Sequence, residues 1–120
     1  MRPHEKLSVW QRAVNLVLAI YKATTSFPKD ERFGLTSQIR RAAVSIPANI
    51  AEGAARDSQK EFTYFLSNAQ GSASELETEL LIAQRLGYLD PTGYAAMRDE
   101  IDSVGRIIFG LSQSIKRKRT

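Results

Sequence analysis

Apolar side chains recur at alternating spacings of three and four residues along most of this chain of 120 residues, and this period restricts the fold more than any other feature. Its longest run, within residues 59–86, continues from Phe62 to Ala83 without a break. Such spacing returns side chains to one face of an α-helix, whereas a half-buried strand needs a period of two. The sequence therefore predicts an all-α protein without strands.

Four segments of the chain carry this period, and short stretches of turn-forming residues separate them. We predict helices over residues 9–26, 36–55, 59–86 and 91–117. Amphipathic helices joined by short connections pack as antiparallel neighbours. We therefore predict one domain over residues 1–120, an antiparallel up-down four-helix bundle with a basic C-terminal tail at residues 116–120.

Capping and turn residues mark the ends of these helices. Pairs with the spacing of a capping box open the first and third helices, namely Ser8 with Gln11 and Ser58 with Glu61. Gly87 has the position of a residue that ends the third helix in a left-handed conformation. Asp90 and Pro91 have the N-cap and first-turn chemistry of the fourth helix.

Pro47 lies inside the second predicted helix, where proline removes a backbone donor and clashes with the carbonyl of Ala43. The apolar stripe nevertheless continues in phase from Ile39 to Ile50. We therefore predict a continuous helix that is kinked at Pro47. A new helix capped by Ser45 is the alternative.

The second helix has another apolar side, opposite the stripe that contains Ile39 and Ile50. Its members are Val44, Ala48, Ala51 and Ala55. Leu16 in the first helix and Phe109 in the fourth also exceed what one bundle core requires. Because large apolar patches usually mark an interface, we predict a homo-oligomer with these four residues of the second helix as interface candidates. The alternative is an irregular bundle in which alanines tolerate exposure.

The residue types that most enzymes and metal sites use are scarce in this chain. Cysteine is absent, which excludes disulfides, thiolate zinc sites and cysteine nucleophiles. The one histidine is His4, so no histidine follows Glu75, Glu77 or Glu79 at the offset of a di-metal carboxylate site. We expect these glutamates to be solvated or paired with arginines. The sequence thus predicts no catalytic residue, metal, cofactor or small-molecule substrate, and hence not an enzyme.

The net charge of +4, from 17 Lys and Arg against 13 Asp and Glu, corresponds to one short basic run. Its members are Lys116, Arg117, Lys118 and Arg119, so residues 1–115 are neutral overall. A cationic segment binds nucleic-acid phosphates by releasing counterions. We therefore take these four residues, with Arg40, Arg41 and Arg56, as nucleic-acid-binding candidates. The alternatives are a tail that only keeps the protein soluble, and arginines that pair with nearby glutamates.

No segment has the length or composition of a membrane anchor or a signal peptide. The longest apolar run, Leu16–Tyr21, is far shorter than the roughly 20 residues that span a bilayer. The basic start of the chain is not followed by the apolar core of a signal sequence. We expect a cytoplasmic protein that does not contact membranes.

Three stretches of the chain, Glu5–Gln11, Phe33–Gly53 and Phe65–Thr78, resemble a known family. They are similar to the bacterial four-helix bundle proteins encoded in intervening sequences of 23S ribosomal RNA genes. This resemblance implies a cytosolic ring, a homopentamer, and carries over no catalytic residues. It extends to the accessory bundle of diversity-generating retroelements, a basic pentamer that works with RNA and a reverse transcriptase. RNA or a ribonucleoprotein is therefore the leading predicted partner, and a protein-interaction scaffold without nucleic acid is the alternative.

Overall fold

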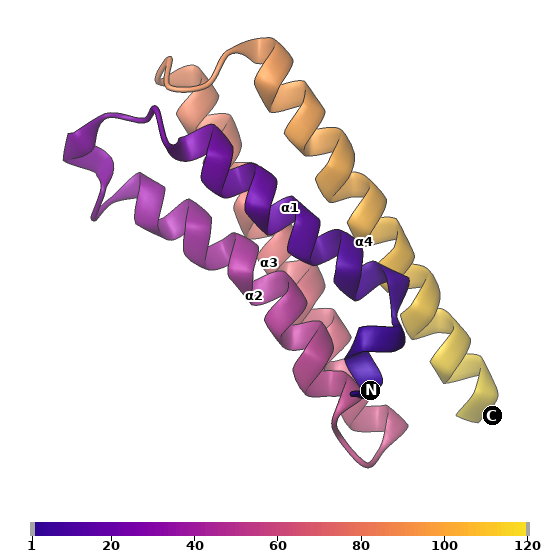
Figure 1. Ribbon diagram of the computed structural model, residues 1–120. Coiled ribbons are helices and arrows are strands. Elements are labelled where there is room, and N and C mark those ends of the chain that lie inside the picture. Colours follow the sequence, from indigo (N-terminus) through magenta and orange to yellow (C-terminus); the bar gives the residue numbers. More distant parts are fainter. Residues whose placement is uncertain (1, 120) are drawn as a thin grey trace.

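The computed structural model describes residues 2–119, apart from the side chain of Arg119, and this part of the chain contains helices but no strand. The α-helices are α1 (Ser8–Thr24), α2 (Leu35–Ala54), α3 (Gln59–Arg85) and α4 (Pro91–Arg119). Short 3-10 turns, η1 (Pro3–Lys6) and η2 (Lys29–Glu31), precede α1 and α2. Each helix packs against the next and α4 returns to α1, which gives the predicted up-down four-helix bundle (Figure 1).

The helix boundaries differ from the predicted ones by at most two residues, because several of the expected caps form. The Ser58 hydroxyl accepts a hydrogen bond from the Glu61 backbone N–H at 3.0 Å, and the Asp90 carboxylate accepts one from the Gly93 N–H at 2.6 Å. Gly87 has a φ of 84° and ends α3 in the left-handed conformation. None of the helices in residues 2–119 is long and apolar enough to cross a membrane.

The predicted capping box at Ser8 is wrong. Ser8 already belongs to α1, and Leu7 is the N-cap, with extended backbone and no capping side-chain hydrogen bond. The Gln11 side-chain amide instead donates to the Glu5 carbonyl at 3.1 Å. The helix begins earlier because the Leu7 carbonyl accepts from the N–H of Trp10, while the Leu7 side chain packs against the core.

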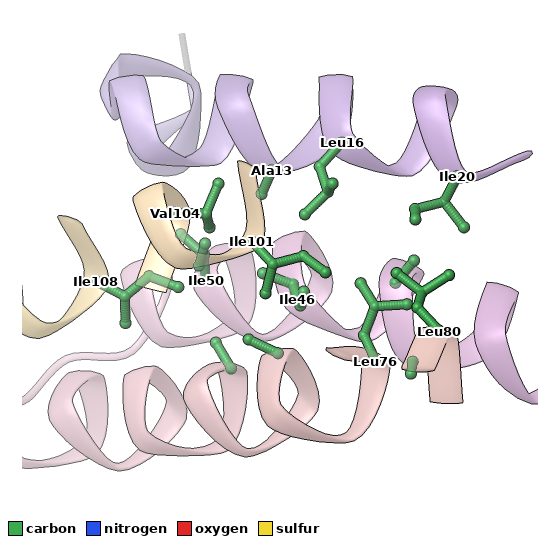
Figure 2. Packing of buried hydrophobic residues seen from close by; sticks show 14 of the residues in the cluster. Ala13, Leu16, Ile20, Ile46, Ile50, Leu76, Leu80, Ile101, Val104 and Ile108 are labelled. Atoms are coloured by element: carbon green, nitrogen blue, oxygen red, sulfur yellow. The ribbon is translucent and has the colours of Figure 1, made fainter. Parts of the chain in front are cut away.

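The core consists of buried side chains from all four helices, which point toward one another along the bundle axis (Figure 2). Leu16 is only 1% exposed and lies in this core, so its assignment to the surplus apolar surface was wrong. The buried stripe of α1 contains Ala13, Leu16 and Ile20. Trp10 and Val17 are partly buried and pack against this core.

The second helix runs without interruption through the buried Pro47. Ser45 does not begin a new helix: its carbonyl accepts a hydrogen bond from the Asn49 side-chain amide at 2.8 Å. The Ser45 hydroxyl lies 2.8 Å from the Ser72 hydroxyl of α3, which links the two helices beside the proline. The continuous helix is thus observed, and the kink at Pro47 stays a prediction.

A glycine near the end of α2 permits a close contact with α3. A Cβ at Gly53 would lie 2.9 Å from the Cβ of Phe65 and 3.0 Å from a ring carbon of Phe62. Such distances are too short for a side chain, so the two helices meet here only because Gly53 has none. This contact lies at the end of the bundle that carries the candidate site.

Candidate nucleic-acid interface

Three cationic segments that are far apart in the sequence meet at one end of the bundle. They are η1, the connection between α2 and α3, and the last turns of α4, which lie at the same end in Figure 1. Their exposed basic side chains define what we call the basic end: Arg2, Lys6, Arg56, Lys60, Lys116, Arg117 and Lys118. An up-down bundle with an even number of helices brings both ends of its chain to the same side as the middle connection.

The positive charge of the basic end comes mainly from α4 and η1. Acidic residues balance the α2–α3 connection, where the Arg56 guanidinium donates to the Glu52 carboxylate at 2.8 Å. The Arg56 guanidinium carbon also lies over the Phe65 ring, 5.0 Å from its centroid, in a cation–π contact. By contrast, the sequence has no acidic residue after Asp102. The last turns of α4 therefore add cations without neighbouring acids on the same helix.

The basic residues predicted as a C-terminal tail belong to α4, which continues to Arg119 rather than ending at residue 117. Lysine and arginine are good helix formers, and their charges are favourable beside the negative end of the helix dipole. The buried Ile115 packs into the core just before them, so Lys116 and Lys118 project from a turn that the bundle holds in place. The Arg119 side chain and Thr120, which the prediction also included, lie outside the described residues.

Arg40 and Arg41 lie away from this end, although they were predicted alongside the basic run. Arg40 donates to the Thr24 hydroxyl at 2.9 Å and to the Tyr21 carbonyl at 3.2 Å, and its guanidinium stacks 4.5 Å from the Tyr21 ring. It therefore links α1 to α2. Arg41 is exposed and forms no ion pair with the described residues, and it lies about 20 Å along α2 from the basic end at 1.5 Å per residue.

Arg2 and Lys6 belong to the basic end but were not among the predicted candidates. Their charges are offset in the sequence by Glu5 and by acids elsewhere in the chain, so a sum over residues 1–115 hides them. The even number of helices could have predicted their place in the site, because it brings the N-terminal segment to the same end of the bundle as the C-terminus of α4. Chain order together with charge therefore predicts this site better than charge alone.

The predicted interface residues lie on the outer face of α2. Val44, Ala48 and Ala55 are exposed and Ala51 is half-buried. The turn η1 packs against the C-terminal part of this face, so the chain itself covers some of it. A hollow of about 450 Å³ remains between η1 and α2, and Ala48, Ala51 and Ala55 line one side of it.

The three glutamates of α3 have different surroundings. Glu77 accepts a hydrogen bond from the Tyr94 hydroxyl at 3.2 Å and pairs with Arg98 at 3.4 Å, as predicted. Glu79 is buried, and one of its carboxylate oxygens has no hydrogen-bond partner, so the expectation that it is solvated or paired with arginine was wrong. Burial, with the nearby Glu75, raises the pKa of Glu79 to about 7. Within residues 2–119, no three acidic or histidine side chains converge as metal ligands.

Comparison with known proteins agrees with the fold and identifies a family. The family model described as 23S rRNA-intervening sequence protein matches residues 5–110. A crystal structure of a protein of unknown function from the S23 ribosomal protein family of Bacteroides thetaiotaomicron VPI-5482 is similar, with a TM-score of 0.78. The two sequences are 23% identical, and the match covers 87% of this chain and 97% of the other. No curated protein matches the chain.

Proposed function

Because this chain belongs to the 23S rRNA-intervening sequence protein family, we propose that it is a non-enzymatic, cytoplasmic four-helix bundle that associates with RNA as a homo-oligomer. The gathering of cationic side chains at the basic end carries this proposal. It needs no cofactor and no small-molecule substrate, and the scarcity of histidine and cysteine supports a binding function over catalysis.

The chemistry of the basic end suits phosphate rather than base recognition. Lysine and arginine contacts to phosphates release counterions, so such binding is independent of sequence and falls steeply with salt. Neither Lys116 nor Lys118 forms an ion pair with a described residue, and both are exposed. Because these side chains lie on a helical turn, they offer phosphate contacts at fixed spacing.

Assembly would strengthen this weak interaction. One basic end with about four phosphate contacts binds RNA weakly, whereas several linked copies raise the avidity by a factor on the order of 100 or more. Apolar side chains that remain on the outside of the bundle support self-association: Leu18, Val44, Tyr64 and Phe109 are 63%, 42%, 62% and 54% exposed. The family resemblance favours five subunits, which light scattering would test.

RNA affinity measured at about 50 and 200 mM salt tests the proposal. The double variant Lys116→Glu with Lys118→Glu should lose about 100-fold in affinity for a long single-stranded RNA at the lower salt, and much of the salt dependence. Lys22→Glu with Lys29→Glu is the matched control, because these exposed lysines lie at the other end of the bundle. Equal losses in both double variants would contradict binding at the basic end.

A protein-interaction scaffold is the second candidate function. A groove of about 820 Å³ runs between α3 and α4, and the exposed Phe109 lies on its wall beside Ala73 and Gly105. A groove with small and aromatic residues suits the side chains of a partner helix. Absence of RNA binding by the wild-type protein even at low salt would favour this function.

A further inference from the structure

The hollow at the basic end has cationic walls and a floor of small residues. It is open to solvent and has a volume of about 450 Å³ between η1 and the outer face of α2. Arg2, directly before η1, and His4 of η1 line one side, and Glu52 of α2 and Arg56 of the α2–α3 connection line the other, together with Ala48 and Ala51. Because the α2 side chains at this level are methyl groups, the turn covers the helix without filling the space.

The charges around the hollow do not cancel. Glu52 is already engaged by Arg56 at 2.8 Å, which neutralises that pair. Arg2 has no ion-pair partner in the part of the chain that the structure describes. Arg56 uses one of its five N–H donors on Glu52, and its stacking on Phe65 at 5.0 Å fixes the plane of the others. The hollow therefore presents hydrogen-bond donors and an uncompensated positive charge.

We propose that this hollow binds a phosphate group of a ribonucleotide, with Arg2 and Arg56 as charged donors and His4 as a further donor. A planar guanidinium pairs with two phosphate oxygens, and arginine is suited to such bidentate recognition. The apolar floor would contact the ribose. This site rests on the proposed function, which it deepens by adding a concave phosphate site to the exposed lysines of α4.

Trp10 provides a readout that is independent of RNA affinity. It is the only tryptophan of the chain, and its ring lies 4.8 Å from that of His4 in an edge-on contact. A phosphate that binds His4 therefore changes the surroundings of the indole. We expect a saturable change in tryptophan emission when inorganic phosphate or a ribonucleoside 5′-monophosphate is added at constant ionic strength, and none with chloride.

Two pairs of variants test where the phosphate binds. Arg2→Ala should lower the phosphate affinity about tenfold. Arg32→Ala should leave this affinity unchanged, because Arg32 is an exposed arginine at the other end of the bundle. Ala48→Leu should block binding without changing any charge, because it fills the hollow, whereas Val44→Leu lies one turn away outside it. Light scattering on each variant excludes a change of assembly as the cause. Wild-type affinity in both Arg2→Ala and Ala48→Leu would overturn the proposal.

The same measurements separate this site from the proposed function. Salt-dependent RNA binding without a saturable phosphate response at Trp10 would refute the hollow and leave the proposed function intact. A saturable phosphate response without RNA binding would support the hollow and refute RNA association. Tighter binding of 5′-phosphorylated RNA than of the 5′-hydroxyl form would assign the hollow to a terminal phosphate, and equal binding would assign it to the chain backbone.

Discussion

The two ends of the bundle are held in different ways. At the end opposite the basic end, which we call the distal end, Glu31 of η2 accepts hydrogen bonds from the Tyr88 hydroxyl at 3.0 Å and the Leu35 N–H at 3.2 Å. The Glu31 carboxylate thus links the α1–α2 connection to the α3–α4 connection. At the basic end, η1 makes hydrogen bonds within itself and to α1 among the described residues, and it meets α2 through packing alone.

The charge along α4 follows the same division. Its first half carries Asp99, Glu100 and Asp102, and Glu100 pairs with Arg12 of α1 at 2.9 Å. Its second half has basic residues and no acid. Part of the charge in the first half of α4 is therefore used within the bundle, whereas Lys116 and Lys118 in its last turns remain available to a ligand. A chain with no net charge over residues 1–115 can still have a different charge at each end of the bundle.

The largest stability effect should come from the helix contact at the basic end. Gly53→Ala places a methyl group 2.9 Å from Phe65, so we expect a loss of about 2 kcal/mol in the free energy of unfolding from overpacking. Gly110→Ala is the control, because a Cβ there meets no atom within 4 Å and α-helices favour alanine. It should gain about 0.5–1 kcal/mol in urea unfolding. A gain for both variants would show that α2 and α3 separate readily here.

The sequence predicted the helices well, because a helix that faces the core needs apolar side chains at alternating spacings of three and four residues. It missed details set by neighbouring elements. Ser8 fits a capping pattern, but η1 lies directly before it and moves the start of α1 to an uncapped position. For the candidate site, the sequence predicted the cations of α4 and missed Arg2. Their proximity depends on which segments meet at one end of the bundle.

Glu79 shows that the sequence also does not predict whether a single charged side chain is buried. Helical spacing places it beside the core stripe that contains Leu76 and Leu80, but spacing alone does not tell whether a side chain at the edge of a stripe reaches water. The packing of the neighbouring helices against α3 decides this. The carboxyl group is consequently buried while Glu77, two residues earlier, finds partners on α4.

The next effect in size should be a pH dependence due to Glu79. Burial raises its pKa from 4.5 to about 7, so the folded state holds the proton more tightly than the unfolded state. The contribution of Glu79 to stability should therefore be most favourable below about pH 4.5 and should fall as the pH rises toward 7. Glu79→Gln should remove this loss, and we expect it to be about 1–2 kcal/mol more stable than wild type at pH 8 but similar at pH 5.

Urea unfolding at both pH values measures this difference. Glu75→Gln is an informative companion, because the Glu75 carboxylate contributes to the raised pKa of Glu79. It should reduce the loss of stability between pH 5 and 8 without abolishing it. Equal stability of wild type and Glu79→Gln at pH 8 would show that this carboxyl group reaches solvent.

The smallest expected effect concerns the link at the distal end. Tyr88→Phe removes the hydroxyl that donates to Glu31 but keeps the ring, whose centroid lies 5.7 Å from that of Phe27. We expect only a small loss in the free energy of unfolding, because solvent can partly replace this hydrogen bond. Because Glu31 also accepts from Leu35, the start of α2 should stay formed. Amide hydrogen exchange should therefore speed up in the α3–α4 connection and remain unchanged in η1. Faster exchange at both ends would show that the two ends of the bundle open together.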